Sequence, residues 1–189
     1  MRAVVVIAAV LLLALPAWAH PQGFHKHVRI VVHEDRVEAL VVMDVDGGRR
    51  SQLLRAGADK DGNGKLDDAE VERLRAQLGA LATSKLKMSF SGHAITLAPE
   101  EVKLNLRGDR KTSEAALSVA VLLGSKLPAA PREGMELVVQ DTSPDRSHVK
   151  VEAEQAVAVP DEKGRPPYGQ GELRPGERFV LKLVAPPSL

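Results

Sequence analysis

After Lys85 the chain consists largely of short segments in which apolar and polar residues alternate, and this pattern constrains its fold more than any other feature. Alternation with a period of two is the signature of a β-strand that buries one face. Two β-branched runs, residues 28–32 and 37–43, form a further predicted hairpin near the start. The alternating segments number seven or eight, and they centre on residues 86–90, 95–97, 102–106, 117–123, 137–139, 149–151 and 179–183. The spacing predicts an antiparallel β-sandwich or barrel, with a long loop at the Pro- and Gly-rich residues 160–176.

Between the hairpin and the later strands, the periodicity changes to that of helices. Residues 49–58 are predicted to form a short helix with Leu53 and Leu54 facing inward, and residues 67–82 a longer one. The apolar face of the longer helix recurs at spacings of three and four, at Val71, Leu74, Leu78 and Leu81. The predicted class is therefore α+β, a mainly antiparallel sandwich or barrel-like domain with a helix–loop–helix inserted at about residues 48–84.

The loop between these helices carries the most informative motif of the chain. Residues 59–70 read Asp-Lys-Asp-Gly-Asn-Gly-Lys-Leu-Asp-Asp-Ala-Glu. Acidic and amide side chains at alternate positions can turn their oxygens towards one point, and the glycine at position 64 permits the sharp turn that follows them. A hard cation that prefers six to eight oxygen ligands suits such a set.

This twelve-residue loop resembles the calcium-binding loop of the EF-hand family, in a chain of secreted bacterial type. The resemblance covers the loop and its two flanking helices, and it implies Ca²⁺ as the bound ion. It also implies that Lys65 contributes its backbone carbonyl, that Asp67 binds directly or through water, and that Glu70 contributes both oxygens. The implied ligands are Asp59, Asp61, Asn63, Lys65, Asp67 and Glu70.

EF-hand loops usually occur in pairs, but a second loop is not found in this sequence. A register beginning at Asp141 places Arg146 where glycine is needed, and one beginning at Asp44 places Arg49 there. The loop is therefore predicted to be single. It either pairs with another copy of itself or is braced by the β domain.

The first residues predict export of the chain. Arg2 precedes an apolar run over residues 3–15, and Ala17-Trp18-Ala19 has the pattern of a cleavage site. The run is too short for a bilayer span, which needs about 20 residues. We expect a signal peptide at residues 1–19, a single exported domain at residues 20–189 in the periplasm or outside the cell, and no membrane span after cleavage.

Charge and cysteine content narrow the remaining functions. The chain has 26 Lys and Arg against 25 Asp and Glu, whereas a nucleic-acid binder normally carries a basic excess. The chain has no cysteine, which excludes disulfides and thiolate chemistry. Hydrolase and phosphate-loop motifs are not found either, so we expect no enzyme. The leading hypothesis is a calcium-binding module with a structural or interaction role, with an unidentified protein as a possible partner.

Histidines near the predicted cleavage site suggest an alternative. Cleavage would leave His20 with a free amine beside its imidazole, a pair that chelates copper(II), and His25 or His27 could complete a nitrogen site. The surrounding residues 20–27 form a short, polar, His-rich stretch that we expect to be mobile. The alternative function is a periplasmic copper- or nickel-handling protein.

Overall fold

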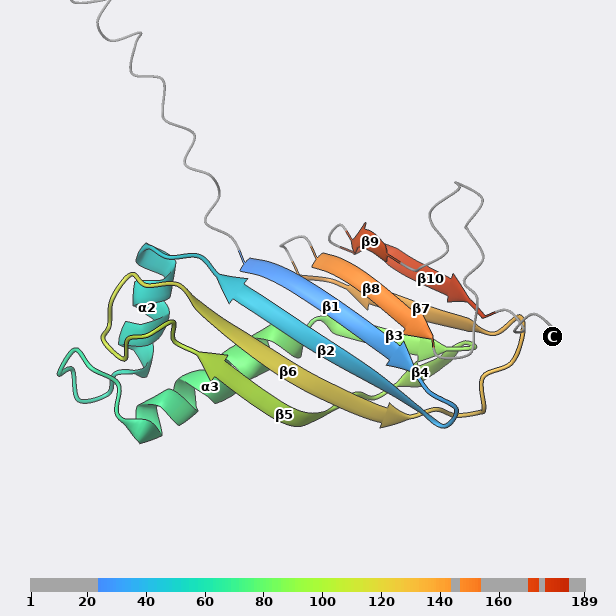
Figure 1. Ribbon diagram of the computed structural model, residues 1–189, viewed down its shortest axis with the longest axis horizontal. Helices are drawn as coiled ribbons and strands as arrows, with labels where there is room; N and C mark the ends of the chain where they lie inside the picture. Colours follow the sequence, from blue (N-terminus) through green and yellow to red (C-terminus); the bar gives the residue numbers. More distant parts are fainter. Residues whose placement is uncertain (1–23, 144–146, 154–169, 174–175, 184–189) are drawn as a thin grey trace, which may run out of the picture.

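The computed structural model describes residues 24–143, 147–153, 170–173 and 176–183, the second and third of these ranges by their backbone (Figure 1). The predicted signal peptide and His20 lie outside the described residues. The expected α+β class is confirmed, because the described residues form mainly antiparallel strands in two sheets together with two helices.

One sheet has six strands and the other has four. In spatial order, the first contains β5 (Ala98–Asn105), β6 (Leu117–Lys126), β2 (Arg36–Val45), β1 (Phe24–Val32), β8 (Ser147–Ala153) and β9 (Gln170–Leu173). The second contains β10 (Arg178–Lys182), β7 (Glu136–Asp141), β3 (Leu86–Phe90) and β4 (His93–Ile95).

The predicted hairpin is confirmed, but it is longer than expected. β1 begins at Phe24 and pairs antiparallel with β2 from Phe24↔Val45 to Val32↔Val37. His25 and His27 therefore belong to a strand, whereas residues 20–27 were expected to be mobile. Alternate side chains from Lys26 onward are buried in β1, so even the polar start of the strand follows the period of the sheet.

The edge of the six-stranded sheet formed by β8 and β9 differs from the sequence prediction in two details. β8 runs parallel to β1, with Val28 opposite Val149, in a domain that was expected to be mainly antiparallel. A parallel neighbour requires a long connection, and most of the chain separates these two strands. β9 then pairs antiparallel with β8, so the predicted loop over residues 160–176 contains a strand.

The helices are α2 (Arg49–Ala58) and α3 (Asp68–Thr83), and α3 packs on β2, β5 and β6. Leu74 and Leu78 are buried as predicted, whereas Leu81 is 42% exposed. Towards the end of α3, the buried residues are Gly79 and Ala82 instead. A Cβ at Gly79 would lie 3.1 Å from Val102 Cγ1, so a small residue is needed for this close approach of helix and sheet.

The inward face predicted for α2 is correct for Leu54, which is half-buried against the core, and wrong for Leu53. Leu53 is 61% exposed, and the buried residues are Ser51, Arg55 and Ala58. This face of α2 meets backbone carbonyls of the loop before β6, and those carbonyls require hydrogen-bond donors rather than leucine side chains. Among the described residues, no helix is long and apolar enough to cross a membrane.

Candidate metal centre

The loop of residues 59–70 connects α2 to α3, and its last residues begin α3. Asp67 is the N-cap, and its Oδ1 accepts the backbone N–H of Glu70 at 2.8 Å. In return, Oε2 of Glu70 accepts the N–H of Asp67 at 3.0 Å, which completes a capping box. The other oxygen, Oε1, accepts the N–H of Lys60, so Glu70 connects the end of the loop to its beginning.

Backbone N–H groups within the loop hold its acidic side chains in place. Asp59 accepts the N–H groups of Gly62 at 2.8 Å and Gly64 at 2.9 Å. Both glycines have positive φ, 70° and 80°, a conformation that costs other residues free energy. Asp61 accepts the N–H of Asn63 at 3.0 Å and its side-chain Nδ2 at 2.7 Å.

Three of the predicted ligands converge. One carboxylate oxygen each from Asp59, Asp61 and Glu70 lie within 4.8 Å of one another. Oxygens on opposite sides of a calcium ion at about 2.3–2.6 Å are roughly 5 Å apart, so this spacing matches one shared ion. Asp67 is not in this group of three, and its Oδ1 caps α3. The side-chain Oδ1 of Asn63 accepts the N–H of Lys65 at 2.8 Å.

A segment far along the chain braces the loop from outside. Lys65 forms an isolated antiparallel β-bridge with Lys111. On either side of this bridge, Leu66 N–H donates to Arg110 O at 2.7 Å and Thr112 N–H donates to Gly64 O at 3.0 Å. Bracing by the rest of the domain, one of the two alternatives for an unpaired loop, is therefore present in this chain.

Arg55 of α2 holds the same segment. Its guanidinium donates to the carbonyls of Leu106 at 2.8 Å, Asp109 at 2.6 Å and Lys111 at 3.2 Å, and its side chain is fully buried. Burial lowers the pKa of Arg55, and the charge of Asp109 partly offsets this. Nothing in the local sequence pattern pointed to this role, since an arginine on a short helix usually faces solvent.

The histidines of the alternative hypothesis are only partly brought together. His25 and His27 lie two residues apart on the exposed face of β1, and His20 lies outside the described residues. Nε2 of His25 is 3.0 Å from Oδ2 of Asp46. Among the described side chains, these two histidines do not form a group of three possible ligands.

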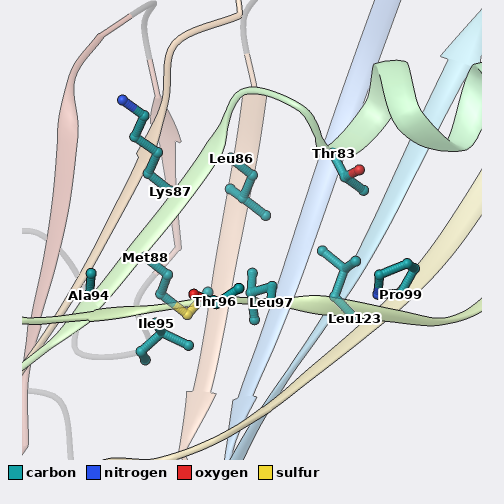
Figure 2. Close-up of a pocket in the computed structure, with 10 residues that line it drawn as sticks. All are labelled: Thr83, Leu86, Lys87, Met88, Ala94, Ile95, Thr96, Leu97, Pro99 and Leu123. Atoms are coloured by element: carbon teal, nitrogen blue, oxygen red, sulfur yellow. The ribbon is translucent and has the colours of Figure 1, made fainter.

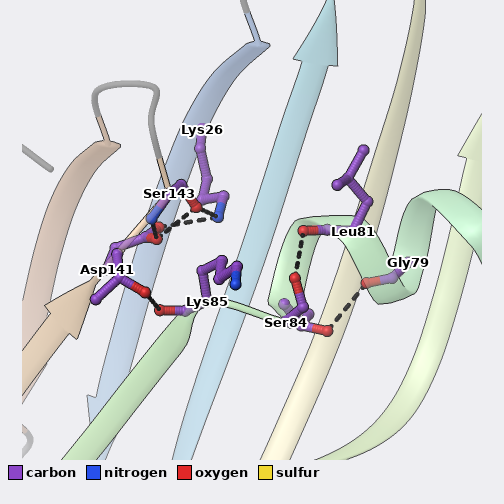
Figure 3. Close-up of polar contacts among 9 residues, drawn as sticks. Lys26, Gly79, Leu81, Ser84, Lys85, Asp141 and Ser143 are labelled. Atoms are coloured by element: carbon purple, nitrogen blue, oxygen red, sulfur yellow. Dashed lines mark hydrogen bonds and ion pairs between the residues drawn. The ribbon is translucent and has the colours of Figure 1, made fainter. Parts of the chain in front are cut away.

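A buried polar cluster between the sheets was missed by sequence reasoning (Figure 3). Lys26 Nζ of β1 donates to Asp141 Oδ2 at 2.9 Å and to Ser143 Oγ at 2.8 Å, and Ser143 Oγ donates to the other oxygen of Asp141. Burial by itself would raise the pKa of Asp141, but the hydrogen bonds from Ser143 and Lys26 outweigh it and leave that pKa below its usual value. This ion pair joins the six-stranded sheet to the four-stranded one.

A pocket of about 390 Å³ lies where the end of α3 meets β3, β4 and the start of β5 (Figure 2). Most of its lining is apolar, and Lys87 is the one titratable residue in it. The lining residues are Thr83, Leu86, Lys87, Met88, Ala94, Ile95, Thr96, Leu97, Pro99 and Leu123. The lining of this pocket therefore does not include a paired acid and base.

Comparison with known proteins adds no family to this description. No family model matches the chain, and no curated protein matches it.

Proposed function

We propose that the chain binds one calcium ion in the loop of residues 59–70, and that the ion has a structural role in an exported protein. The observation that carries the proposal is the convergence of Asp59, Asp61 and Glu70, whose oxygens lie within 4.8 Å of one another in a loop of EF-hand register. Without a cation, three carboxylates this close repel one another. A bound Ca²⁺ would offset that repulsion.

The remaining implied ligands have supporting positions. Asn63 and Lys65 follow Asp61 in the turn, and Asp67 stands at the start of α3. Ca²⁺ accepts side-chain oxygens, backbone carbonyls and water together, so a mixed ligand set of this kind suits it better than the strictly octahedral Mg²⁺. Glu70 is the residue whose loss should matter most, since it would supply two oxygens and already joins both ends of the loop.

We propose the finer features of the architecture on the same basis. The buried residues of both sheets and of α3 form one hydrophobic cluster, which supports a sandwich-like stacking of the sheets. α2, the loop and α3 would then be an EF-hand helix–loop–helix inserted between β2 and β3. This placement, with bracing by residues 110–112, favours a structural ion over a sensor.

Calcium titration by isothermal calorimetry tests the proposal. We expect one site per chain with a dissociation constant of about 10⁻⁵ to 10⁻³ M, a weak affinity like that of extracellular modules. Glu70→Gln should weaken binding at least tenfold. Asp68→Asn is the matched control, because Asp68 is an adjacent acid whose side chain is 91% exposed and pairs with Arg110. If the wild-type chain gives no heat of binding at millimolar calcium, or if both variants weaken it equally, the proposal is wrong.

A further inference from the structure

The outer face of the six-stranded sheet carries apolar side chains at its centre. In β2 and β6, the residues that alternate with the buried core positions include Leu40, Val42, Ala120 and Leu122. Leu40 is 37% exposed, and the other three are half-buried. The register pairs Leu40 with Leu122 and Val42 with Ala120, so these four side chains form one contiguous patch, called the outer patch below.

Among the described residues, the packed layer lies on the other side of this sheet. α3 covers that other side, where a Cβ at Gly79 would contact the side chains of Val102 and Val121. Figure 1 looks onto the six-stranded sheet with α3 behind it, and no described helix or strand lies in front of β2 or β6. The outward face of such a sheet is normally polar, because water solvates it. A contiguous apolar patch on this face indicates an interaction surface.

The sequences of β2 and β6 also favour cover on both faces. Residues 39–43 read Ala-Leu-Val-Val-Met, and residues 119–123 read Val-Ala-Val-Leu-Leu. Continuous apolar runs are typical of strands that are buried on both sides, whereas a strand with one solvated side alternates apolar and polar residues. The composition of these two strands therefore suits a sheet that has a second layer on its outer face.

Charged residues of opposite sign lie at the two ends of the central row of the outer patch. The register continues from Leu122 to Glu101 of β5 and from Leu40 to Arg29 of β1. Across four strands the row therefore reads Glu101, Leu122, Leu40, Arg29, and both charged residues are exposed. A two-fold axis parallel to the strands reverses this row in a second copy of the chain. Leucine then faces leucine, and each Glu101 faces the Arg29 of the other copy.

Ion pairs within the chain neutralise the remaining sides of the outer patch. At one end of β2, Arg36 pairs with Glu38 at 3.1 Å and with Glu100 at 2.9 Å. At the other end, Arg107 Nη2 is 3.3 Å from Asp44 Oδ1. Charges that are already paired oppose the approach of a second copy only weakly. An apolar centre with a polar rim is also the usual anatomy of a protein–protein interface.

We propose that the outer patch pairs two copies of this chain face to face about such a two-fold axis. Adjacent strands are about 4.8 Å apart and each residue adds about 3.3 Å, so four strands of about eight residues present roughly 500 Å² per copy. A standard interface buries about 800 Å² per partner. We therefore expect a reversible dimer with a dissociation constant of about 10⁻⁶ to 10⁻⁴ M. The patch includes no residue of the loop of residues 59–70, so the proposal does not rest on calcium binding.

Sedimentation equilibrium of the exported chain, from about 1 μM to 1 mM at a fixed calcium concentration, tests the proposal. Leu40→Lys should weaken dimerisation at least tenfold, because it places an ammonium group of each copy in the apolar centre of the interface. Val180→Lys is the matched control. Val180 is an apolar strand residue that is 46% exposed, and it lies on β10 of the other sheet. This variant should dimerise as the wild-type chain does.

Charge reversal tests the two-fold axis. Arg29→Glu or Glu101→Arg alone should weaken dimerisation, since each places like charges opposite one another at two symmetry-related contacts. The two substitutions combined should restore it. Within one chain these positions are three strand spacings apart, about 14 Å, so a direct contact inside the chain cannot explain the restoration.

Three results would overturn the proposal. The first is a wild-type chain that stays monomeric up to about 1 mM. The second is dimerisation of Leu40→Lys as strong as that of Val180→Lys, with urea denaturation showing that both variants are folded. The third is loss of the dimer with Glu70→Gln and not with Leu40→Lys, which would place the contact at the loop of residues 59–70. Failure of the combined charge reversal to restore dimerisation would contradict the axis.

Discussion

The backbone N–H of Leu66 donates a 2.7 Å hydrogen bond to the carbonyl oxygen of Arg110. This contact joins the loop of residues 59–70 to a segment that follows β5, and Leu66 itself is buried. Here a strand-like segment of the same domain provides the backbone partner, so an unpaired loop can keep its shape.

Arg55 should be essential to this bracing. In Arg55→Met the carbonyls of Leu106 and Asp109 lose their charged donor. Hydrogen bonds to charged groups contribute about 1.5–3 kcal/mol each, so we expect the free energy of unfolding to fall by at least about 3 kcal/mol. Urea denaturation measures this change, and calcium calorimetry on the same variant should show weaker binding.

The control for this variant is Arg49→Met, an exposed arginine on the same helix. Its free energy of unfolding should stay within about 0.5 kcal/mol of the wild-type value. Equal destabilisation by both variants would mean that the buried hydrogen bonds of Arg55 do not hold the segment.

Two leucines on α3 should differ sharply in their contribution to stability. Leu74 is fully buried and Leu81 is 42% exposed, although the helical periodicity placed both on the inner face. Leu74→Ala should cost about 2–5 kcal/mol of unfolding free energy, the usual range for a buried leucine. Leu81→Ala should cost less than about 1 kcal/mol, and similar costs in chemical denaturation would contradict this orientation of the helix.

Calcium should raise the melting temperature without exposing apolar surface. At a hundredfold excess over the dissociation constant, binding to the folded state alone stabilises it by about 2.7 kcal/mol. For a chain of this size that corresponds to roughly 5–10 °C in calorimetric melting. Leu74 and Leu78 are already buried in the core, so binding of a hydrophobic dye should not change. A large calcium-dependent increase in dye binding would favour a sensor instead.

The ion pair between Lys26 and Asp141 should make stability fall in acid. The pKa of Asp141 is lowered in the folded state, so its stabilising contribution is present above the unfolded pKa of about 3.9. It is lost as the pH falls through the lower, folded value. Asp141→Asn leaves Lys26 buried without its anion, which should cost about 3–5 kcal/mol at pH 7.

Urea denaturation from pH 6 to pH 3 should therefore show a narrowing difference between the wild-type chain and Asp141→Asn below about pH 4. Glu136→Gln is a control on the same strand, because Glu136 pairs with Lys182 at the surface. A constant difference between wild type and Asp141→Asn across this range would show that Asp141 does not titrate as proposed.

Much of this protein is determined by residues close together in the sequence. The candidate calcium ligands all lie within twelve consecutive residues, and the capping box needs only Asp67 and Glu70, three residues apart. Strand positions can be recognised from the alternation of apolar and polar residues, because successive side chains of a strand point to opposite faces of the sheet. Such features depend on local backbone geometry, so the residues that form them can be recognised without the fold.

Only the tertiary structure decided the contacts between distant residues. The partner of Lys26 is Asp141, the partner of Arg55 is the segment before β6, and the neighbour of His27 is His148. The exposure of Leu53 also depends on tertiary packing, because the buried face of α2 meets backbone carbonyls through Ser51 and Arg55. Local periodicity predicts which face of a helix or strand is buried. Which groups that face contacts depends on how the sheets and helices pack, and that packing is set by the whole chain at once.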